Sequence, residues 1–477
     1  MAPERVTTTA PSNTNWTLRS DRSTRHARSS GRAIVALAIA TAVGSVGLAA
    51  GGTAGALQAT EMTGSSVSAG LPLGGLVAGS ALGALLISRA TSRAGRTTGL
   101  VLGYGLGAAG AAVAVGAAVL GSFGLLLAGS VAMGAANAAV FLTRYAAADT
   151  TGAAGRGRAL GVVLFGAAVG AVAGPNLLAP SGQLASGMGL PHLTGLYLVA
   201  VPAFAVAGVI LAVLGRYARD DRMLRTLSGS TRPAFRTLPR TLTASGAASS
   251  RAEPERSSGS WRSMRAAVLV LAVTNLVMVA VMAIAPLHLV AHGHDLDVVG
   301  VIVSVHVVCM LAPAPLAGWL VDRTGTPTLE GVGAALLVAA GVAAALADAH
   351  DAVAFTVVLA LLGLGWCAGI VAGSTMLATS LPAPERLRAE GIGEVAMGLA
   401  AGASAPIAGV VVALGGFPTL AFACAAVAVL AIVPAAANTR PPSSAAGMRG
   451  DVHAAARTHP ALAADVPSEA PTSQVET

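Results

Sequence analysis

Residues Gly318-Trp-Leu-Val-Asp322-Arg323-Thr-Gly325 form a short polar step at the end of one apolar stretch, 298–321, and just before another, 329–347. A helix of about 20 apolar residues crosses the ~30 Å hydrocarbon layer of a membrane. Both flanking stretches are long enough for this. The octapeptide is therefore predicted to connect two transmembrane helices, with its charged pair at the membrane surface.

Similar apolar stretches follow one another along most of the chain. The predicted spans are residues 33–58, 68–88, 98–120, 123–147, 159–178, 195–214, 266–289, 298–321, 329–347, 353–377, 392–414 and 420–436. The first stretch is longer than the hydrophobic core of a cleaved signal peptide, so it is counted as a span. The sequence thus predicts an all-α membrane protein with twelve transmembrane helices.

Composition supports a membrane protein and excludes several other classes. Of 477 residues, 54% are hydrophobic and 10% are charged, whereas about a quarter are charged in a soluble domain. The net charge of +8 comes from scattered arginines with few aromatic residues among them, which indicates contact with membrane lipid rather than nucleic acid. The chain has no lysine, which excludes a P-loop ATPase. Its three cysteines lie in separate apolar stretches, so we predict no disulfide, no metal site and no cofactor.

The arginines occupy alternate gaps between the predicted spans. They cluster at residues 89–96, 144–158 and 386–388, and the intervening gaps contain none. Cationic loops resist translocation and stay in the cytoplasm. The pattern predicts a multi-pass protein of a bacterial-type plasma membrane with both termini in the cytoplasm.

The two halves of the chain repeat each other at a spacing of about 230 residues. Arg156-Gly-Arg158-Ala-Leu-Gly161 opens the fifth predicted span, and Arg386-Leu-Arg388-Ala-Glu-Gly391 opens the eleventh. Parallel repeats of this kind place a binding site near the membrane midplane between two pseudo-symmetric six-helix bundles. The predicted parts are a disordered N-tail (1–32), an N-terminal bundle (33–215), a cytoplasmic linker (216–265), a C-terminal bundle (266–436) and a disordered C-tail (437–477).

Residues 318–325 match the pattern G-x-L-x-D-R-x-G, and with the repeat they make the chain resemble the major facilitator superfamily over about residues 33–436. The resemblance implies a secondary transporter that works by alternating access. It also implies a signature loop that helps to close the cytoplasmic side. The signature residues are Gly318, Asp322, Arg323 and Gly325, and the copy in the first half keeps Arg93, Gly95 and Arg96 but has Ser88 and Ser92 in place of its glycine and aspartate.

Asp322 is expected to act as a latch. A helix N-terminus attracts anions, and pseudo-symmetry led us to place Asp322 beside Arg388, at the start of the eleventh span in the same half. The alternative is that Asp322 and Arg323 only build a tight turn.

The fifth span carries Gly161, Gly170, Gly174 and Pro175, which resemble the family's exporter motif as far as the Gly-Pro pair. Close helix packing through small residues is the alternative explanation. Drug/proton antiporters of the family often carry an arginine in the fourth span where this chain has Ser130. Arg144, later in that span, is expected to extend to the membrane surface.

Few ionisable or amide side chains lie within the predicted spans, and such groups mark transport pathways. The candidates for a substrate or proton path are His306, Asn137, Asn275, Gln58, Glu394 and Glu61. His306 is the one histidine well inside a span, and imidazole titrates near neutrality. A hydrogen bond between helices and, for Glu394, a helix-dipole partner are the structural alternatives.

These patterns predict proton-coupled efflux of a small apolar or cationic compound by a monomer that is not an enzyme. A metabolite transporter of the same fold is an alternative. The loop His292-Gly-His294-Asp-Leu-Asp297 has side chains that bind transition metals, so divalent-metal transport stays open too. A non-transporting membrane sensor and a polytopic membrane enzyme are the alternatives from other classes.

Overall fold

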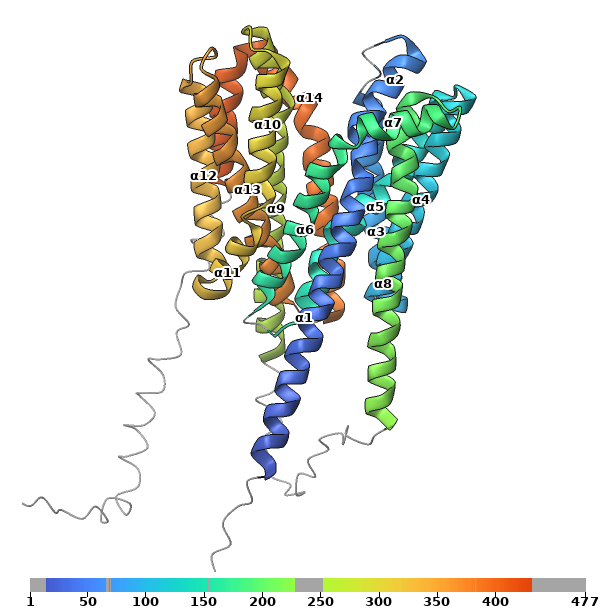
Figure 1. Ribbon diagram of the computed structural model, residues 1–477. Coiled ribbons are helices and arrows are strands. Elements are labelled where there is room, and N and C mark those ends of the chain that lie inside the picture. Colours follow the sequence, from blue (N-terminus) through green and yellow to red (C-terminus); the bar gives the residue numbers. More distant parts are fainter. Residues whose placement is uncertain are drawn as a thin grey trace, which may run out of the picture. The chain divides into compact units, whose positions relative to one another are not determined.

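The computed structural model describes residues 14–65, 68, 70–152, 155–227, 252–381 and 383–430 (Figure 1). The first half forms a bundle of helices. They are α1 (Thr14–Ala49), which continues through the π-helix η1 (Ala50–Ala54) into α2 (Gly55–Thr63), then α3 (Leu71–Ala94), α4 (Arg96–Leu120), α5 (Phe123–Asp149), α6 (Arg156–Asn176), α7 (Leu178–Gly187), the 3-10 turn η4 (His192–Thr194) and α8 (Gly195–Leu227).

The second half forms a second bundle. Its helices are α9 (Ala252–Ala291), α10 (Leu296–Leu311), α11 (Ala314–Thr324), α12 (Thr326–Leu346), α13 (Ala352–Ser380) and α14 (Ala383–Val429). α10 and α11 follow each other across Pro313 and together form one apolar span, Asp297–Thr324. The fold is all-α, as predicted.

Among the described residues, eleven helical segments are long and apolar enough to cross a membrane. One of them, Glu385–Val429, contains two predicted spans in a single continuous assignment. Its backbone breaks at Gly416, which has φ 77° and ψ 177°. Glycine adopts a positive φ without the steric cost that other residues meet, and Pro418 follows at once. The break separates the eleventh and twelfth spans, so the structure agrees with twelve helices in two bundles.

Three predicted boundaries shift, and parts of the tails and linker cannot be compared. α1 begins at Thr14, so residues 14–32 are helical rather than disordered as the sequence analysis had it. Residues 14–30 contain neither glycine nor proline, and nothing stops the first span from continuing as a helix beyond its apolar part. In the same way α8 and α9 run into the predicted linker. Residues 1–13, 228–251 and 431–477 lie outside the described residues.

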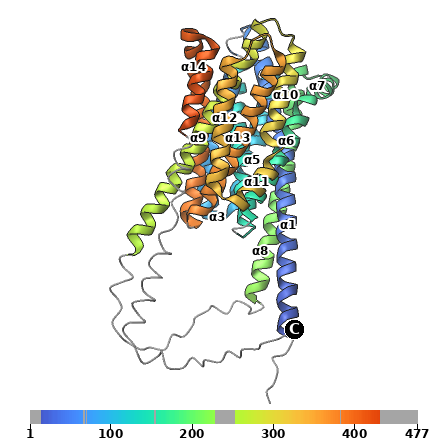
Figure 2. The same ribbon diagram turned by 90° about the vertical axis from the view of Figure 1, so that its left-hand side faces the viewer.

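Small residues set the distances between helices. A methyl group on Gly79 would overlap the backbone of Val131, and one on Gly134 would overlap the backbone of Leu76, so α3 and α5 pack with their backbones nearly touching. Such contacts replace the hydrophobic driving force, which is weak between helices surrounded by lipid. Between the bundles, α6 packs on α11 and α3 packs on α14 (Figures 1 and 2).

Candidate functional site

The two cross-bundle contacts lie at the end of the bundles that carries the arginines at 89–96, 144–158, 323 and 386–388; we call it the arginine end. The contact between α6 and α11 is the capped seam, and the contact between α3, α4, α5 and α14 is the charged seam. Pseudo-symmetry relates them, since Ser88 corresponds to Gly318 and Gly157 to Leu387 at the offset of 230 residues.

Asp322 occupies the centre of the capped seam. Its carboxylate accepts hydrogen bonds from the backbone N–H groups of Gly157, at 2.8 Å, and Arg158, at 2.9 Å. These are among the first four N–H groups of α6, which have no partner within the helix. The carboxylate also faces the positive end of the helix dipole. Asp322 therefore caps a helix of the opposite bundle.

Our sequence-based placement of Asp322 was wrong. We expected it in its own half beside Arg388, but Arg388 is exposed and the hydrogen bonds run to α6 of the other half. The pseudo-twofold relation brings each signature loop to the opposite bundle. The segment next to it is therefore the fifth span and not the eleventh.

Glycine makes the capped seam possible. A methyl group on Gly318 would overlap the carbonyl oxygen of Gly157, and one on Gly157 would meet Val321 and the Asp322 carboxylate. One turn further along, a methyl group on Gly161 would overlap the backbone of Ala314. The signature glycine thus lets the backbones of α6 and α11 approach closely enough for the cap. Gly157 was missed by the sequence analysis, although it lies between the two arginines of the repeat.

The charged seam uses different chemistry. The Ser88 hydroxyl donates to the carbonyl oxygen of Leu387 at 2.9 Å, which is the counterpart of the Gly318–Gly157 contact. Ser92, the counterpart of Asp322, donates to the carbonyl oxygen of Arg89 in its own helix instead. No carboxylate of the α3–α4 loop reaches α14, because the sequence has none there.

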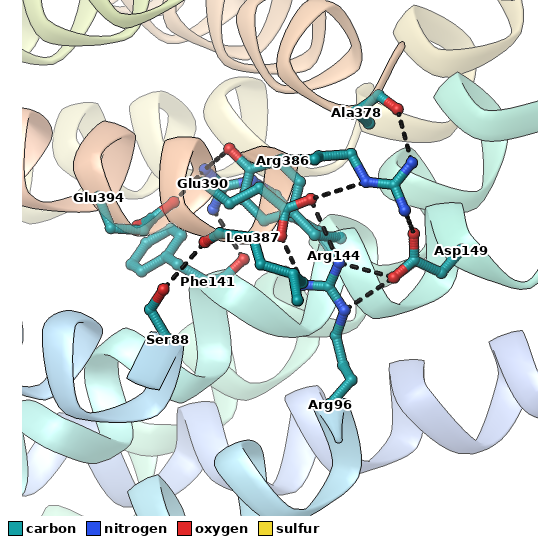
Figure 3. A network of polar contacts seen from close by, with 11 residues as sticks. Ser88, Arg96, Phe141, Arg144, Asp149, Ala378, Arg386, Leu387, Glu390 and Glu394 are labelled. Carbon is teal, nitrogen blue, oxygen red and sulfur yellow. Dashed lines mark hydrogen bonds and ion pairs between the residues drawn. The ribbon is translucent and has the colours of Figure 1, made fainter. Parts of the chain in front are cut away.

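Ion pairs replace that carboxylate (Figure 3). Arg96 binds both carboxylate oxygens of Glu390, with Nη1–Oε2 at 2.5 Å and Nη2–Oε1 at 3.2 Å. Its Nη2 also lies 2.6 Å from Asp149. Arg386 approaches the second oxygen of Asp149 at 2.7 Å. Planar guanidinium groups suit such paired contacts, so four charges from α4, α5 and α14 form one network.

The innermost pair of the charged seam joins Arg144 and Glu394 at 2.5 Å. The Arg144 side chain is fully buried and that of Glu394 is 7% exposed. Arg144 also donates from Nε to the Ser374 hydroxyl at 2.9 Å and from Nη1 to the Phe141 carbonyl oxygen at 2.8 Å. Positions 144 and 374 are 230 residues apart, so equivalent positions of α5 and α13 meet at the pseudo-axis. We expected Arg144 to extend to the surface; it points inward because Glu394 offers it a buried partner.

A small cavity adjoins this network. Its volume is about 10 Å³, and it is lined by Arg96 and Glu390 together with Ile87, Ser88, Thr91, Leu100, Leu142 and Leu387. This is close to the smallest space that holds one water. The structure thus places room for a single solvent molecule beside the carboxylate of Glu390.

Sequence reasoning missed Glu390, Asp149, Arg386 and Ser374. One signal was available: Arg144 and Glu394 both lie inside predicted spans near their arginine ends, and charges inside a membrane pair with one another. That rule predicts partners but not which ones, because the bundle interface is not visible in the sequence.

The other polar candidates lie within single bundles. The His306 ring is buried, with Nδ1 2.8 Å from the carbonyl oxygen of Leu359, and it joins α10 to α13. Asn275 accepts from Trp366 Nε1 at 3.0 Å and donates to the carbonyl oxygen of Met397 at 2.9 Å. These contacts correspond to the structural alternative, a hydrogen bond between helices.

The polar candidates of the first bundle divide into three kinds. Asn137 donates to the Ser80 hydroxyl at 3.0 Å and joins α5 to α3. Gln58 is buried, and its Oε1 has no hydrogen-bond partner among the described residues. Glu61 is exposed. Of the three, only Gln58 has unused hydrogen-bonding capacity in a buried place.

The fifth-span motif packs in two directions. Gly161 contacts α11, as described above, whereas a methyl group on Gly170 would overlap the backbone of Ala42 in α1. Gly174 is buried, and α6 ends at Asn176, directly after Pro175. Proline lacks the N–H group that a continuing helix needs.

The remaining signature residues lie at the surface of the arginine end. Gly95 has φ 93° and Gly325 has φ 87°, and each lies between two consecutive helices. Glycine is required for such values. Arg93 is exposed, and the Arg323 guanidinium lies 4.3 Å from the centre of the Trp319 ring. In the loop near His292, His294 Nε2 lies 2.9 Å from the Ala349 carbonyl oxygen, and no three potential ligands in the described part of the chain come together for a metal ion.

Comparisons with known proteins give the family. Residues 267–466 match the Major Facilitator Superfamily. YdeG, an uncharacterized MFS-type transporter of Bacillus subtilis (strain 168), is 32% identical over 385 residues, which cover 80% of this chain and 86% of YdeG. The riboflavin transporter RfnT of Brucella anthropi is 27% identical over 355 residues, or 74% of this chain and 82% of RfnT.

The solved structure of FucP, an MFS transporter in the outward conformation, has the same fold. Its TM-score is 0.60 at 16% identity, and the alignment covers 86% of this chain and 99% of FucP. The signature loop, the repeat, the two bundles and the relatives agree. The chain belongs to the major facilitator superfamily and is a secondary transporter rather than an enzyme.

Proposed function

We propose that this transporter exports a small apolar or cationic compound across the plasma membrane in exchange for protons. Both termini and the arginine end lie in the cytoplasm under this proposal, in agreement with the distribution of arginines. The bundles are in contact at that end, so the structure corresponds to the state in which the cytoplasmic side is closed.

The buried ion pair between Arg144 and Glu394 carries the proposal. It joins the two bundles, so it must break whenever the cytoplasmic side opens. Separating a buried pair leaves two uncompensated charges, which costs several kcal/mol. Protonation of Glu394 removes one of these charges beforehand. Arg144 keeps its contacts with Ser374 and the Phe141 carbonyl oxygen during that step.

Proton binding and opening are thereby linked. A proton that enters from outside neutralises Glu394 and loosens the charged seam. Opening then exposes Glu394 to the cytoplasm, where it releases the proton, and closure restores the pair. The remaining charges around it are Arg96, Asp149, Arg386 and Glu390, which bind one another in the outer layer of the seam.

The exported compound is proposed to be apolar or cationic because the bundles offer few free polar groups. His306, Asn275 and Asn137 already hold partners within their own bundles. The partial exporter motif at Gly161, Gly170, Gly174 and Pro175 supports the outward direction. Ser130, where many drug/proton antiporters have arginine, argues against a mechanism identical to theirs. The Arg144–Glu394 pair offers a proton site at a different depth of α5.

A specific observation favours a second substrate class, a neutral compound with several hydrogen-bonding groups. Gln58 Oε1 and the Tyr197 hydroxyl are buried, and neither has a hydrogen-bond partner among the described residues. Tyr197 lies beside Gly55, one turn from Gln58, and η1 is directly before them. π-Helical turns occur often at functional sites. The relative RfnT is a riboflavin transporter, and riboflavin is the first compound of this class to test.

The decisive measurement is proton flux in liposomes. Purified protein is reconstituted with a pH-sensitive dye inside, a proton gradient is imposed, and lipophilic cations, antibiotics, riboflavin and divalent metal ions are added in turn. Proton movement triggered by one compound, absent with the Glu394→Gln variant, supports the proposal. Substrate movement by Glu394→Gln with an unchanged dependence on the proton gradient would refute it.

A further inference from the structure

A groove at the arginine end, outside the cross-bundle seams, has the properties of a lipid site. Its volume is about 550 Å³, within the range of small-molecule sites. The lining comes from α1, the end of α5 and the start of α6, and comprises Ser30, Gly31, Ile34, Val35, Thr150, Thr151, Gly152, Gly155, Arg158, Ala159 and Val162. We infer that this groove binds one acidic phospholipid of the cytoplasmic leaflet, with its phosphate on Arg158.

The shape of the groove follows from the glycines around it. Further along the same two helices, methyl groups on Gly166 and Gly170 would overlap the backbone of α1, so α1 and α6 are closely packed there. Toward the arginine end the helices separate, and Gly31, Gly152 and Gly155 contribute no side chains to fill the space. The Ser30 hydroxyl donates to the Thr150 carbonyl oxygen at 2.8 Å and holds the end of α5 against α1.

Charge selects the headgroup. Arg158 is the one charged residue in the lining, and the lining contains no carboxylate. Guanidinium groups bind phosphate through paired hydrogen bonds. The amine of a zwitterionic headgroup would find no acidic partner, and it would lie close to the Arg158 charge. The groove therefore favours a lipid with net negative charge, such as phosphatidylglycerol.

Apolar side chains continue from the groove toward the middle of the membrane. Ile34, Val35 and Val162 line its inner part. Beyond them Ile39 of α1 and Phe165 and Val169 of α6 are exposed on the helix surfaces. An acyl chain can lie along these side chains while the phosphate stays at the surface. This combination distinguishes a phospholipid from a free anion.

The site also adjoins the capped seam. The backbone N–H of Arg158 donates to Asp322 at 2.9 Å, while its side chain lines the groove. A bound headgroup would fix the first turn of α6 and hold that N–H in line with the carboxylate. The lipid is thus expected to stabilise the contact between α6 and α11. This inference depends on the topology proposed above, which places the groove in the cytoplasmic leaflet.

Native mass spectrometry of the purified full chain tests the site without any transport measurement. Phosphatidylglycerol and phosphatidylcholine with identical acyl chains are titrated separately. We expect one phosphatidylglycerol to be retained, and the Arg158→Gln variant to bind it about tenfold more weakly, since it loses a charge-assisted contact. Arg89→Gln, which alters an exposed arginine of the same end, is the matched control and should bind as wild type.

A second variant separates lipid binding from misfolding. No atom lies within 4 Å of a methyl group placed on Gly31, so Gly31→Leu fills the groove without removing the arginine. Weaker phosphatidylglycerol binding is expected here too. Equal retention of both lipids, or wild-type retention by both groove variants, would overturn the inference. Displacement of the lipid by inorganic phosphate would also overturn it, because the site would then be one for free anions. Failure of proton coupling in liposomes leaves these results unaffected.

Discussion

The capped seam and the charged seam are pseudo-symmetric copies that hold the bundles together in different ways. In the capped seam α6 begins at Arg156, so the N–H groups of residues 157 and 158 are free and Asp322 binds them. In the charged seam α14 begins at Ala383, and the corresponding residues 387 and 388 already lie inside the helix. Their N–H groups bond to carbonyl oxygens four residues earlier.

The difference explains why one copy of the signature is degraded. A carboxylate at position 92 would find no free N–H group to cap. The charged seam instead uses Arg96, Arg144, Glu390 and Glu394, whose counterparts in the capped seam, Thr326, Ser374, Leu160 and Leu164, are uncharged. The start of a helix thus decides whether a dipole cap or an ion pair closes the seam.

The largest effect is expected from Glu394→Ala. Arg144 would remain buried without its counter-charge, which should lower the free energy of unfolding by about 3–5 kcal/mol. The double variant Glu394→Ala with Arg144→Met should recover most of this, because both charges are then absent. Thermal unfolding in detergent measures both. If the single variant is as stable as the double variant, the buried pair does not hold the charged seam.

Arg96→Gln tests the outer layer of the charged seam. It leaves Glu390, whose side chain is 1% exposed, without its paired contact. A loss of about 3 kcal/mol in unfolding free energy is expected, at the lower end for a broken buried pair. Arg93→Gln, from the same signature copy but exposed, should change stability by less than about 0.5 kcal/mol. Equal effects of the two variants would show that the Glu390 contact has no special weight.

Asp322→Asn tests the capped seam. Its loss should cost about 1 kcal/mol, the usual value for a helix cap, and should change the transport rate as well. Asp351→Asn is the matched control. That carboxylate caps α13 within one bundle, through Val353 at 2.9 Å and Ala354 at 3.0 Å. Similar stability losses are expected for both variants, but only the first should alter the rate of substrate transport in liposomes. An unchanged rate in Asp322→Asn contradicts the latch.

The smallest effect is expected from Ser92→Asp, which restores the signature aspartate. Because residues 387 and 388 have no free N–H groups, stability should change by less than about 0.5 kcal/mol. Unfolding curves of this variant and of the wild type decide the matter. A clear stabilisation would mean that α14 begins later than Ala383, and the explanation of the two seams would fail.

Much of the fold could be predicted because membrane insertion reads local sequence. Apolar length gave the twelve spans, and the offset of 230 residues gave the two bundles. Helix ends were less certain: the sequence of residues 14–32 suggested disorder, but α1 begins at Thr14. Polarity predicts where a helix leaves the membrane and not where it stops.

The candidate site was predictable only in part. The sequence identified Asp322 and Glu394 as candidates, because ionisable groups are rare in or beside membrane spans. It did not give their partners, since Gly157 and Arg144 are 165 and 250 residues away along the chain. Nothing in the sequence marked Glu390 as different from a solvated residue at a helix start.

By itself the sequence determined that this chain is a membrane protein built from two repeated halves, because hydrophobicity and spacing are local properties. The tertiary structure alone decided which charges meet. The pseudo-twofold relation brings Asp322 to α6 and Glu394 to Arg144. Pairing across the bundles depends on helix starts and on backbone contacts such as Gly318 on Gly157, and both are set by packing in three dimensions.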